Sequence, residues 1–119
     1  NTVTAVYTLV NGLNGELASN YSLANDSLAA TITAKALTMT GSSVAPSKVY
    51  DGRTTATVTV GALTGEVAGE TLGQTTVVGT YNSKNVVGAN TVTAVYTLVN
   101  GLNGELASNY SLANDSLAA

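Results

Sequence analysis

Apolar and polar residues alternate most regularly near the two ends of this chain. In residues 91–99, Val92, Ala94, Tyr96 and Leu98 share one face, while threonines fill most of the other face. A period of two is the pattern of a strand with one buried face. It predicts a half-buried strand at residues 91–99, and the identical letters at residues 2–10 predict another.

Shorter stretches carry the same signal. In residues 55–60, Ala56, Val58 and Val60 would point inward and the intervening threonines outward. Glycine- and asparagine-rich segments separate the expected strands and predict tight turns. Further strands are expected at residues 75–78, at 109–112 with its twin 20–23, and around 31–34. This spacing favours an all-β fold, an immunoglobulin-like β-sandwich of about seven strands; a β-grasp-like module with one short helix is the alternative.

Residues 1–30 recur letter for letter as residues 90–119. The offset of 89 residues indicates a tandem array of repeats of that length. The alternation changes phase near Ala36, because Ile32, Ala34 and Ala36 share one phase while Leu37 and Met39 occupy the other. A phase change marks a bulge or a module boundary. We therefore expect residues 1–35 to be the C-terminal part of one repeat and residues 36–119 to be the nearly complete following repeat.

The two copies of the repeated segment differ at their C-terminal ends. The first copy continues into residues 31–34, whereas the second stops at Ala119. If residues 31–34 are a strand, the second repeat lacks its last strand and leaves an open sheet edge. Such an edge would pair with the equivalent strand of a neighbouring chain.

Composition narrows the possible functions. Only 9% of the residues are charged, and four cations, Lys35, Lys48, Arg53 and Lys84, stand against seven acidic residues. No basic patch for nucleic acid is therefore expected. The absence of His and Cys argues against an enzyme, and it leaves no catalytic residue, cofactor site or metal site to predict. No apolar run is long enough to predict membrane insertion in this fragment.

Two motifs containing tyrosine have a structural and a ligand-binding interpretation. Asp51-Gly52 is a turn dipeptide, and Tyr50 would anchor that turn to the core. Asn109-Tyr110 precedes an alternating run, so its ring is expected inside with a hydrogen-bonded hydroxyl. The structural interpretation is preferred for both motifs over display of an aromatic ring to a ligand.

Two stiffening devices stay open as alternatives. Calcium between repeats would have to use Glu16 and Asp26 or their twins Glu105 and Asp115. An intramolecular isopeptide bond would join Lys48 or Lys84 to Asn109 beside Asp51. Sequence spacing does not show whether these groups meet.

Several motifs occur in an order that carries a family likeness. They are Lys48-Val49-Tyr50-Asp51-Gly52, Gly61-Ala62-Leu63-Thr64-Gly65, Lys84-Asn85-Val86-Val87-Gly88 and Asn109-Tyr110-Ser111-Leu112. This order resembles the YDG and MBG-type repeats of bacterial filamentous-haemagglutinin-like surface adhesins. Glu70 stands where that family usually has Asp, and Val87 looks like an insertion. The resemblance gives Lys48, Tyr50, Asp51, Gly52, Lys84, Asn85, Gly88, Asn109 and Tyr110 as structural motif residues.

The same resemblance implies a location and a role. It implies a protein of the bacterial cell surface, outer-membrane-attached or secreted, exported by a type V pathway. We expect a stalk or spacer repeat that projects an adhesive region for attachment or biofilm formation, with adjacent copies of the repeat as partners. The alternative is a weak glycan- or matrix-binding module that acts by avidity over many copies.

Overall fold

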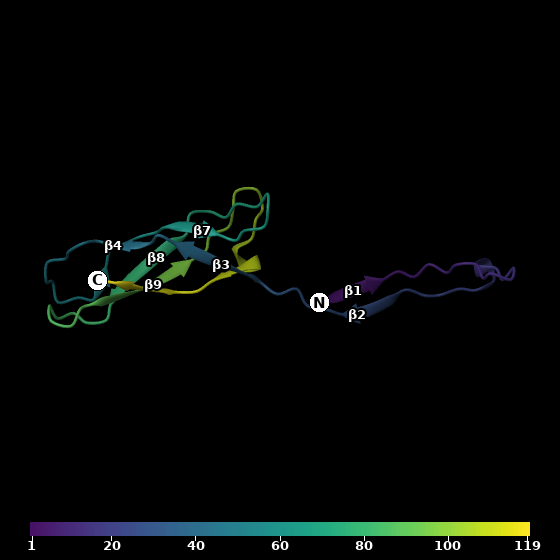
Figure 1. Ribbon diagram of the computed structural model, residues 1–119, viewed down its shortest axis with the longest axis horizontal. Helices are drawn as coiled ribbons and strands as arrows, with labels where there is room; N and C mark the ends of the chain where they lie inside the picture. The colour runs from purple at the N-terminus through teal and green to yellow at the C-terminus, as the bar shows by residue number, and fades with distance from the viewer. The chain divides into compact units, whose positions relative to one another are not determined.

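The computed structural model describes all residues, 1–119, and they group into two compact units, Asn1–Thr33 and Ala34–Ala119 (Figure 1). The first unit contains strands β1 (Thr2–Ala5) and β2 (Asp26–Ala29) and a 3-10 helix, η1 (Ala18–Asn20). The strands of the second unit are β3 (Lys35–Thr40), β4 (Ser43–Val44), β5 (Thr55–Ala56), β6 (Val58–Thr59), β7 (Ala62–Thr64), β8 (Thr76–Tyr81), β9 (Thr91–Thr97), β10 (Tyr110–Leu112) and β11 (Asp115–Ala118); its 3-10 helix is η2 (Ala107–Asn109).

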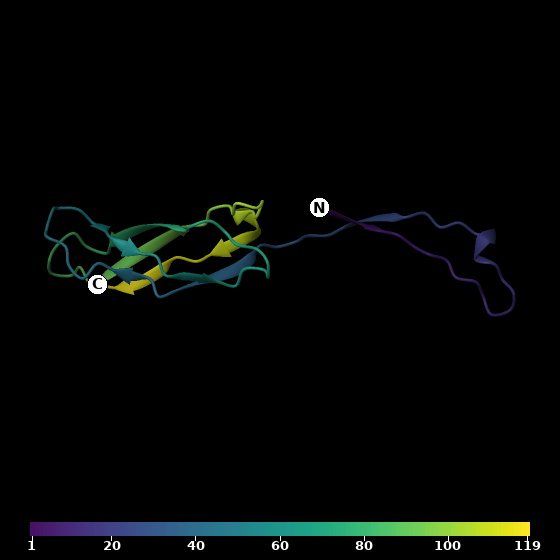
Figure 2. The same ribbon diagram turned by 90° about the horizontal axis from the view of Figure 1, so that it is seen from above.

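The all-β prediction is confirmed. In the second unit, a four-stranded antiparallel sheet has the order β11-β9-β8-β5. A second sheet has the order β10-β3-β7, in which β3 runs parallel to β10 and antiparallel to β7. Strands β4 and β6 form a small third sheet. Figure 2 shows β3 and β10 starting at the end of this unit opposite the C mark.

Helices contribute almost nothing to the fold. The only helical segments are the two 3-10 helices, of three residues each. The β-grasp-like alternative, which needs a helix packed on its sheet, is therefore not the architecture. None of the helices has the length and apolar character needed to cross a membrane.

Side chains of both larger sheets form the core of the second unit. Met39 of β3 packs with Ala94 and Tyr96 of β9. Leu37 of β3 packs with Leu72 and Tyr110. Along β9, Val92, Ala94 and Tyr96 are buried and the residues between them are exposed, as the alternation predicted. The two sheets therefore pack face to face as a sandwich.

The run at residues 55–60 forms two strands in place of one. β5 pairs with β8 of the large sheet, whereas β6 pairs with β4. Ala56, Val58 and Val60 still face inward, and the threonines between them are exposed. A chain that passes from one sheet to the other makes such a corner, and its side-chain alternation continues through it. This division helps to raise the number of strands in the second unit to nine, above the predicted seven or so.

The duplicated residues behave differently in the two units. β1 pairs with β2 in the same register as β9 with β11: Thr2 lies opposite Ala29, and Thr91 opposite Ala118. β9 is longer because β8 pairs along its other edge. The strand predicted for residues 2–10 therefore ends at Ala5.

Two further strand predictions are wrong. Residues 20–23 form no strand, because β10, the twin segment, is held by β3, and the first unit contains no equivalent of β3. Residues 31–34 form no strand either, and Ile32 is 96% exposed. The second repeat was expected to have an open sheet edge because it lacks an equivalent of residues 31–34. Since residues 31–34 form no strand, the fold gives no support for that open edge. Lys35 is the first residue of β3; the repeat boundary after this residue stays a prediction.

Candidate functional site

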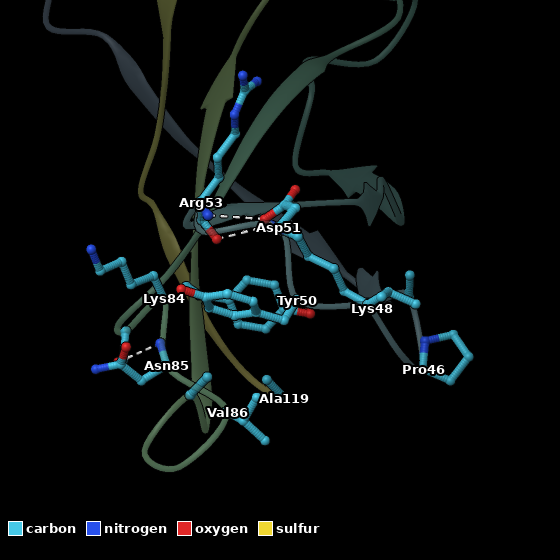
Figure 3. A pocket seen from close by; sticks show the side chains of 14 residues that line it. Pro46, Lys48, Tyr50, Asp51, Arg53, Lys84, Asn85, Val86 and Ala119 are labelled. Atoms are coloured by element: carbon cyan, nitrogen blue, oxygen red, sulfur yellow. Dashed lines mark hydrogen bonds and ion pairs between the residues drawn. The ribbon is translucent and has the colours of Figure 1, made fainter.

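Two loops of the second unit, together with Ala119, line an open cavity of about 220 Å³. One loop follows β4 and the other follows β8 (Figure 3). Five of the motif residues taken from the sequence line this cavity: Lys48, Tyr50, Asp51, Lys84 and Asn85. Gly52 and Gly88 belong to the same loops, whereas Asn109 and Tyr110 lie elsewhere.

A polar network fixes the first loop. The Lys48 ammonium lies 2.9 Å from an Asp51 carboxylate oxygen and donates to the carbonyl oxygens of Arg53 and Thr55 at 3.0 and 2.9 Å. These three partners use all three donors of the ammonium. The Arg53 amide also donates to Asp51 at 2.9 Å, and Gly52 has a φ of +77°, which glycine adopts without strain. Hydrogen bonds from Lys48 and from the Arg53 amide lower the pKa of the Asp51 carboxyl.

Tyr50 does not anchor this turn to the core. Its side chain is 60% exposed and lines the cavity, and its neighbour Val49 is 89% exposed. The network around Lys48 and Asp51 already holds the loop, so the turn does not depend on burial of an aromatic ring. The expectation that Tyr50 serves as a core anchor is therefore wrong.

The second loop is organised by Asn82, a residue that the sequence interpretation did not select. Its amide nitrogen donates to the Gly88 carbonyl at 3.1 Å, and its amide oxygen accepts from the backbone N–H groups of Asn90 and Thr91. Gly88 has a φ of +101°. The strand expected at residues 75–78 ends four residues before Asn82, so the available signal was an asparagine in a segment rich in Asn, Ser and Gly, where its side chain can hydrogen-bond the loop backbone.

Charge is concentrated at this cavity. Lys48, Arg53 and Lys84 line it together with one carboxylate, Asp51, although the whole chain has a net charge of −3. The composition predicted no basic patch, but the fold gathers three of the four cations in one place. Lys48 makes the only ion pair of the structure, and no hydrogen bond involves the Arg53 guanidinium or the Lys84 ammonium.

Tyr110 belongs to a second polar cluster, outside the cavity. Its side chain is only 6% exposed; the hydroxyl donates to Glu70 and accepts from the Val67 amide at 3.1 Å. The hydrogen bond to Glu70 raises the pKa of the Tyr110 hydroxyl. Glu66 accepts from the Leu72 amide at 2.7 Å. These contacts hold the loop between β7 and β8 against β10.

The acidic residues considered as calcium ligands accept hydrogen bonds from groups within their own unit. Glu16 and Glu105 accept from backbone amides two residues earlier in their loops. Hydrogen bonds from each residue's own backbone, and then from these amides, lower the pKa of both carboxyls. Asp26 and Asp115 accept from Tyr7 and Tyr96, at 3.1 Å in each copy. No three acidic side chains gather where they could hold one ion.

The groups proposed for an isopeptide bond are not assembled either. Lys48, Lys84 and Asp51 line the cavity, whereas Asn109 does not. Asn109 ends η2, directly before β10. The structure therefore does not bring Asn109 to the cavity where Lys48, Lys84 and Asp51 lie.

Known proteins give one clear relationship. No curated protein and no solved structure matches the chain. The profile of the YDG domain matches residues 33–117. This range contains nearly all of the second unit, including the two loops of the cavity and the Tyr110 cluster. The chain belongs to the YDG domain family.

Proposed function

We propose that this chain is a stalk or spacer repeat of a bacterial cell-surface or secreted adhesin, and that it projects an adhesive region for attachment or biofilm formation. One observation carries the proposal: the same thirty residues recur at an offset of 89 and form a hairpin of the same register in both units. A spacer needs its copies only to fold alike. Near-identity between copies therefore suits a spacer.

The loop within the repeated segment supports this proposal. Asn11 accepts from the Ala18 amide at 2.7 Å, and its twin Asn100 accepts from the Ala107 amide at 2.8 Å. The next element, a 3-10 helix, has the same three-residue length in both copies. The segment forms this structure from its own residues, as a unit repeated in series must.

The proposed location rests on the family resemblance and is compatible with how the core is built. The second unit builds its core from strands and loops and contains no cysteine. A chain that needs no disulfide can cross a secretion pore unfolded and fold afterwards. Export by a type V pathway is part of the proposal.

Copy number in the bacterium tests this function. The parent protein would be produced with its natural number of repeats and with half of them, while every non-repeat segment is kept. We expect attachment to a surface or host cell to fall in the shortened form, since its adhesive region lies closer to the cell. Immunofluorescence of the non-repeat segments controls for display. Unchanged attachment at equal display would argue against a spacer.

The cavity favours a second candidate function, a weak binding module that acts by avidity. An exposed aromatic ring and two cations without ion-pair partners at one cavity are not needed for a spacer. Binding to a glycan or matrix surface that grows steeply with repeat number would support this candidate. The two functions are compatible in one protein.

A further inference from the structure

We propose that the cavity between the loops after β4 and β8 binds an acidic saccharide, a sugar ring that carries a carboxylate or a sulfate. The inference goes beyond the spacer function, which requires no ligand. It rests on the charge, the exposed ring, the volume and the rigidity of this site (Figure 3).

The charge at the cavity is available to a ligand. Lys48 has used its three donors within the loop and neutralises Asp51. Arg53 and Lys84 make no ion pair. Figure 3 shows the Arg53 guanidinium pointing away from Tyr50, so the site offers a ligand one cation without an ion-pair partner, Lys84. Its ammonium can donate to carboxylate or sulfate oxygens, and such charge-assisted hydrogen bonds are shorter and stronger than neutral ones.

The exposed ring narrows the ligand class. Tyr50 is 60% exposed at the cavity, and Val49 and Val86 beside it are 89% and 82% exposed. A simple polyanion would use only the cations and would leave these apolar surfaces in water. A sugar ring has an apolar face, which can pack on an aromatic ring while its charged substituent binds a cation. Tyrosine suits such contacts, since its ring is rigid and its hydroxyl remains polar.

The volume limits the ligand to a small unit. At about 220 Å³, the cavity lies below the range of roughly 300–1,000 Å³ that is typical of drug-sized ligands. One ring with its charged substituent is a more suitable occupant than a helix or a folded segment. Binding to a single repeat is therefore weak, and copies in series would strengthen it through multivalency.

Both loops are preformed. Lys48 and Asp51 hold the first loop, and Asn82 holds the second. A ligand therefore has little backbone to order when it binds, which preserves affinity in a small site. The side chains of Tyr50 and Lys84 belong to neither network, so both can be replaced without loss of the fold.

Nuclear magnetic resonance titration of the 119-residue chain tests the proposal with three matched probes. They are digalacturonate, which carries carboxylates, galactobiose 6-sulfate, which carries a sulfate, and neutral galactobiose. We expect amide shifts at Tyr50, Arg53 and Lys84 that saturate with one or both acidic probes and weaken with added salt. The response to each acidic probe shows which anion the site prefers. We expect no saturating shift with the neutral probe.

Matched variants separate a site from general charge attraction. Tyr50→Ala and Lys84→Gln should each weaken binding about tenfold, since each removes one contact with the ligand. Lys35→Gln removes a cation outside the cavity, and Tyr21→Ala removes an exposed tyrosine from the first unit; neither should change the dissociation constant. Unfolding temperatures within about 2 °C of the parent chain would show that a variant has kept its fold.

Four results would overturn the proposal. One is the absence of a saturating shift at the cavity with either acidic probe, and another is equal binding of the neutral one. A third is that poly-glutamate binds the cavity as well as the acidic saccharides, which would show a site for any polyanion. The last is an equal loss of binding in Lys35→Gln and Lys84→Gln, which would show attraction without a defined site. None of these results bears on the spacer function.

Discussion

Identical residues have different environments in this chain. Val92 lies in β9 and is fully buried, whereas its twin Val3 in β1 is 50% exposed. Tyr110 is 6% exposed and its twin Tyr21 is 72% exposed. Their immediate sequence neighbours are the same, so the difference comes from the strands around them. The contribution of a residue to stability is therefore set by its tertiary contacts.

The valine pair gives a direct test of this difference. Val92→Ala removes two buried methyl groups and leaves a cavity, so it should lower the free energy of unfolding of the second unit by about 2–3 kcal/mol. Val3→Ala makes the same change at an exposed position and should stay within about 0.5 kcal/mol. Urea denaturation of the two variants measures both effects. Equal losses would contradict the burial difference.

Tyr110 gives a pH prediction. The hydrogen bond to Glu70 raises the pKa of its hydroxyl above the ordinary value of 10.0. The hydrogen bond contributes fully to stability at pH values below 10.0, the pKa of tyrosine in the unfolded chain. This contribution is lost as the pH rises through the higher pKa of Tyr110 in the folded protein. Tyr110→Phe should therefore unfold at a lower temperature at pH 7 and lose less stability than the parent chain above pH 10. Tyr96, whose pKa is raised by burial, titrates in both proteins.

Thermal unfolding between pH 7 and pH 11 measures this difference. The gap in unfolding temperature between Tyr110→Phe and the parent chain should narrow at the alkaline end. Parallel curves over the whole range would show that Tyr110 does not contribute to the pH dependence.

At the scale of elements, an alternating sequence forms a strand where a neighbouring strand is present to pair with it. Alternation alone predicted β9 and its buried face. The strand expected at residues 75–78 overlaps the first half of β8, which continues to Tyr81. Residues 20–23 and 31–34 have strand-like letters, but no neighbouring strand pairs with them. The division between β5 and β6 was not predictable, because the alternation does not change where the chain passes between sheets.

The cavity was even less accessible to sequence reasoning. The sequence provided most of its motif residues, and the Asp51-Gly52 turn follows from local chemistry. The composition gives the number of cations, four, but not their positions in space. It therefore did not predict that Arg53 and Lys84 line the same cavity. The exposure of Tyr50 was missed too, since an aromatic residue beside a turn more often packs inward.

A glycine pair tests how closely elements pack. A Cβ at Gly101 would overlap the carbonyl oxygen of Thr71, whereas at its twin Gly12 it would meet only the side chain of Glu16, which can move. Neither glycine has a positive φ. Gly101→Ala should therefore destabilise the second unit by about 1–3 kcal/mol, and Gly12→Ala should leave that unit unchanged.

Calorimetry measures the unfolding of the second unit in the two glycine variants. The glycine at residue 101 should matter because the loop after β9 lies against the backbone of residue 71. An unfolding temperature of Gly101→Ala equal to that of the parent chain would show that the two segments are not in close contact.

At the scale of the whole molecule, the second unit has its own core. Its two apolar clusters draw no residue from the first unit. A chain that starts at Ala34 should therefore unfold cooperatively, at a temperature within about 2 °C of the second unit in the 119-residue chain. Calorimetry of the two chains measures this. Loss of the cooperative transition in the shorter chain would show that the second unit depends on its neighbour.

Modules that fold independently are what a stalk requires, because length is then added one copy at a time. A weak saccharide site on each copy would give the same array many contacts with an acidic glycan surface. The spacer function and the proposed site can therefore coexist, although they are tested separately.

The length of the array tests the central claim most directly. Chains of one, two and four repeats would be measured by small-angle X-ray scattering. If the repeats form a stalk, the maximum dimension grows by a constant increment for each added repeat, about 30–40 Å when strands run along the long axis at roughly 3.3 Å per residue. A radius of gyration that instead grows only as a compact body of the same mass would contradict the stalk.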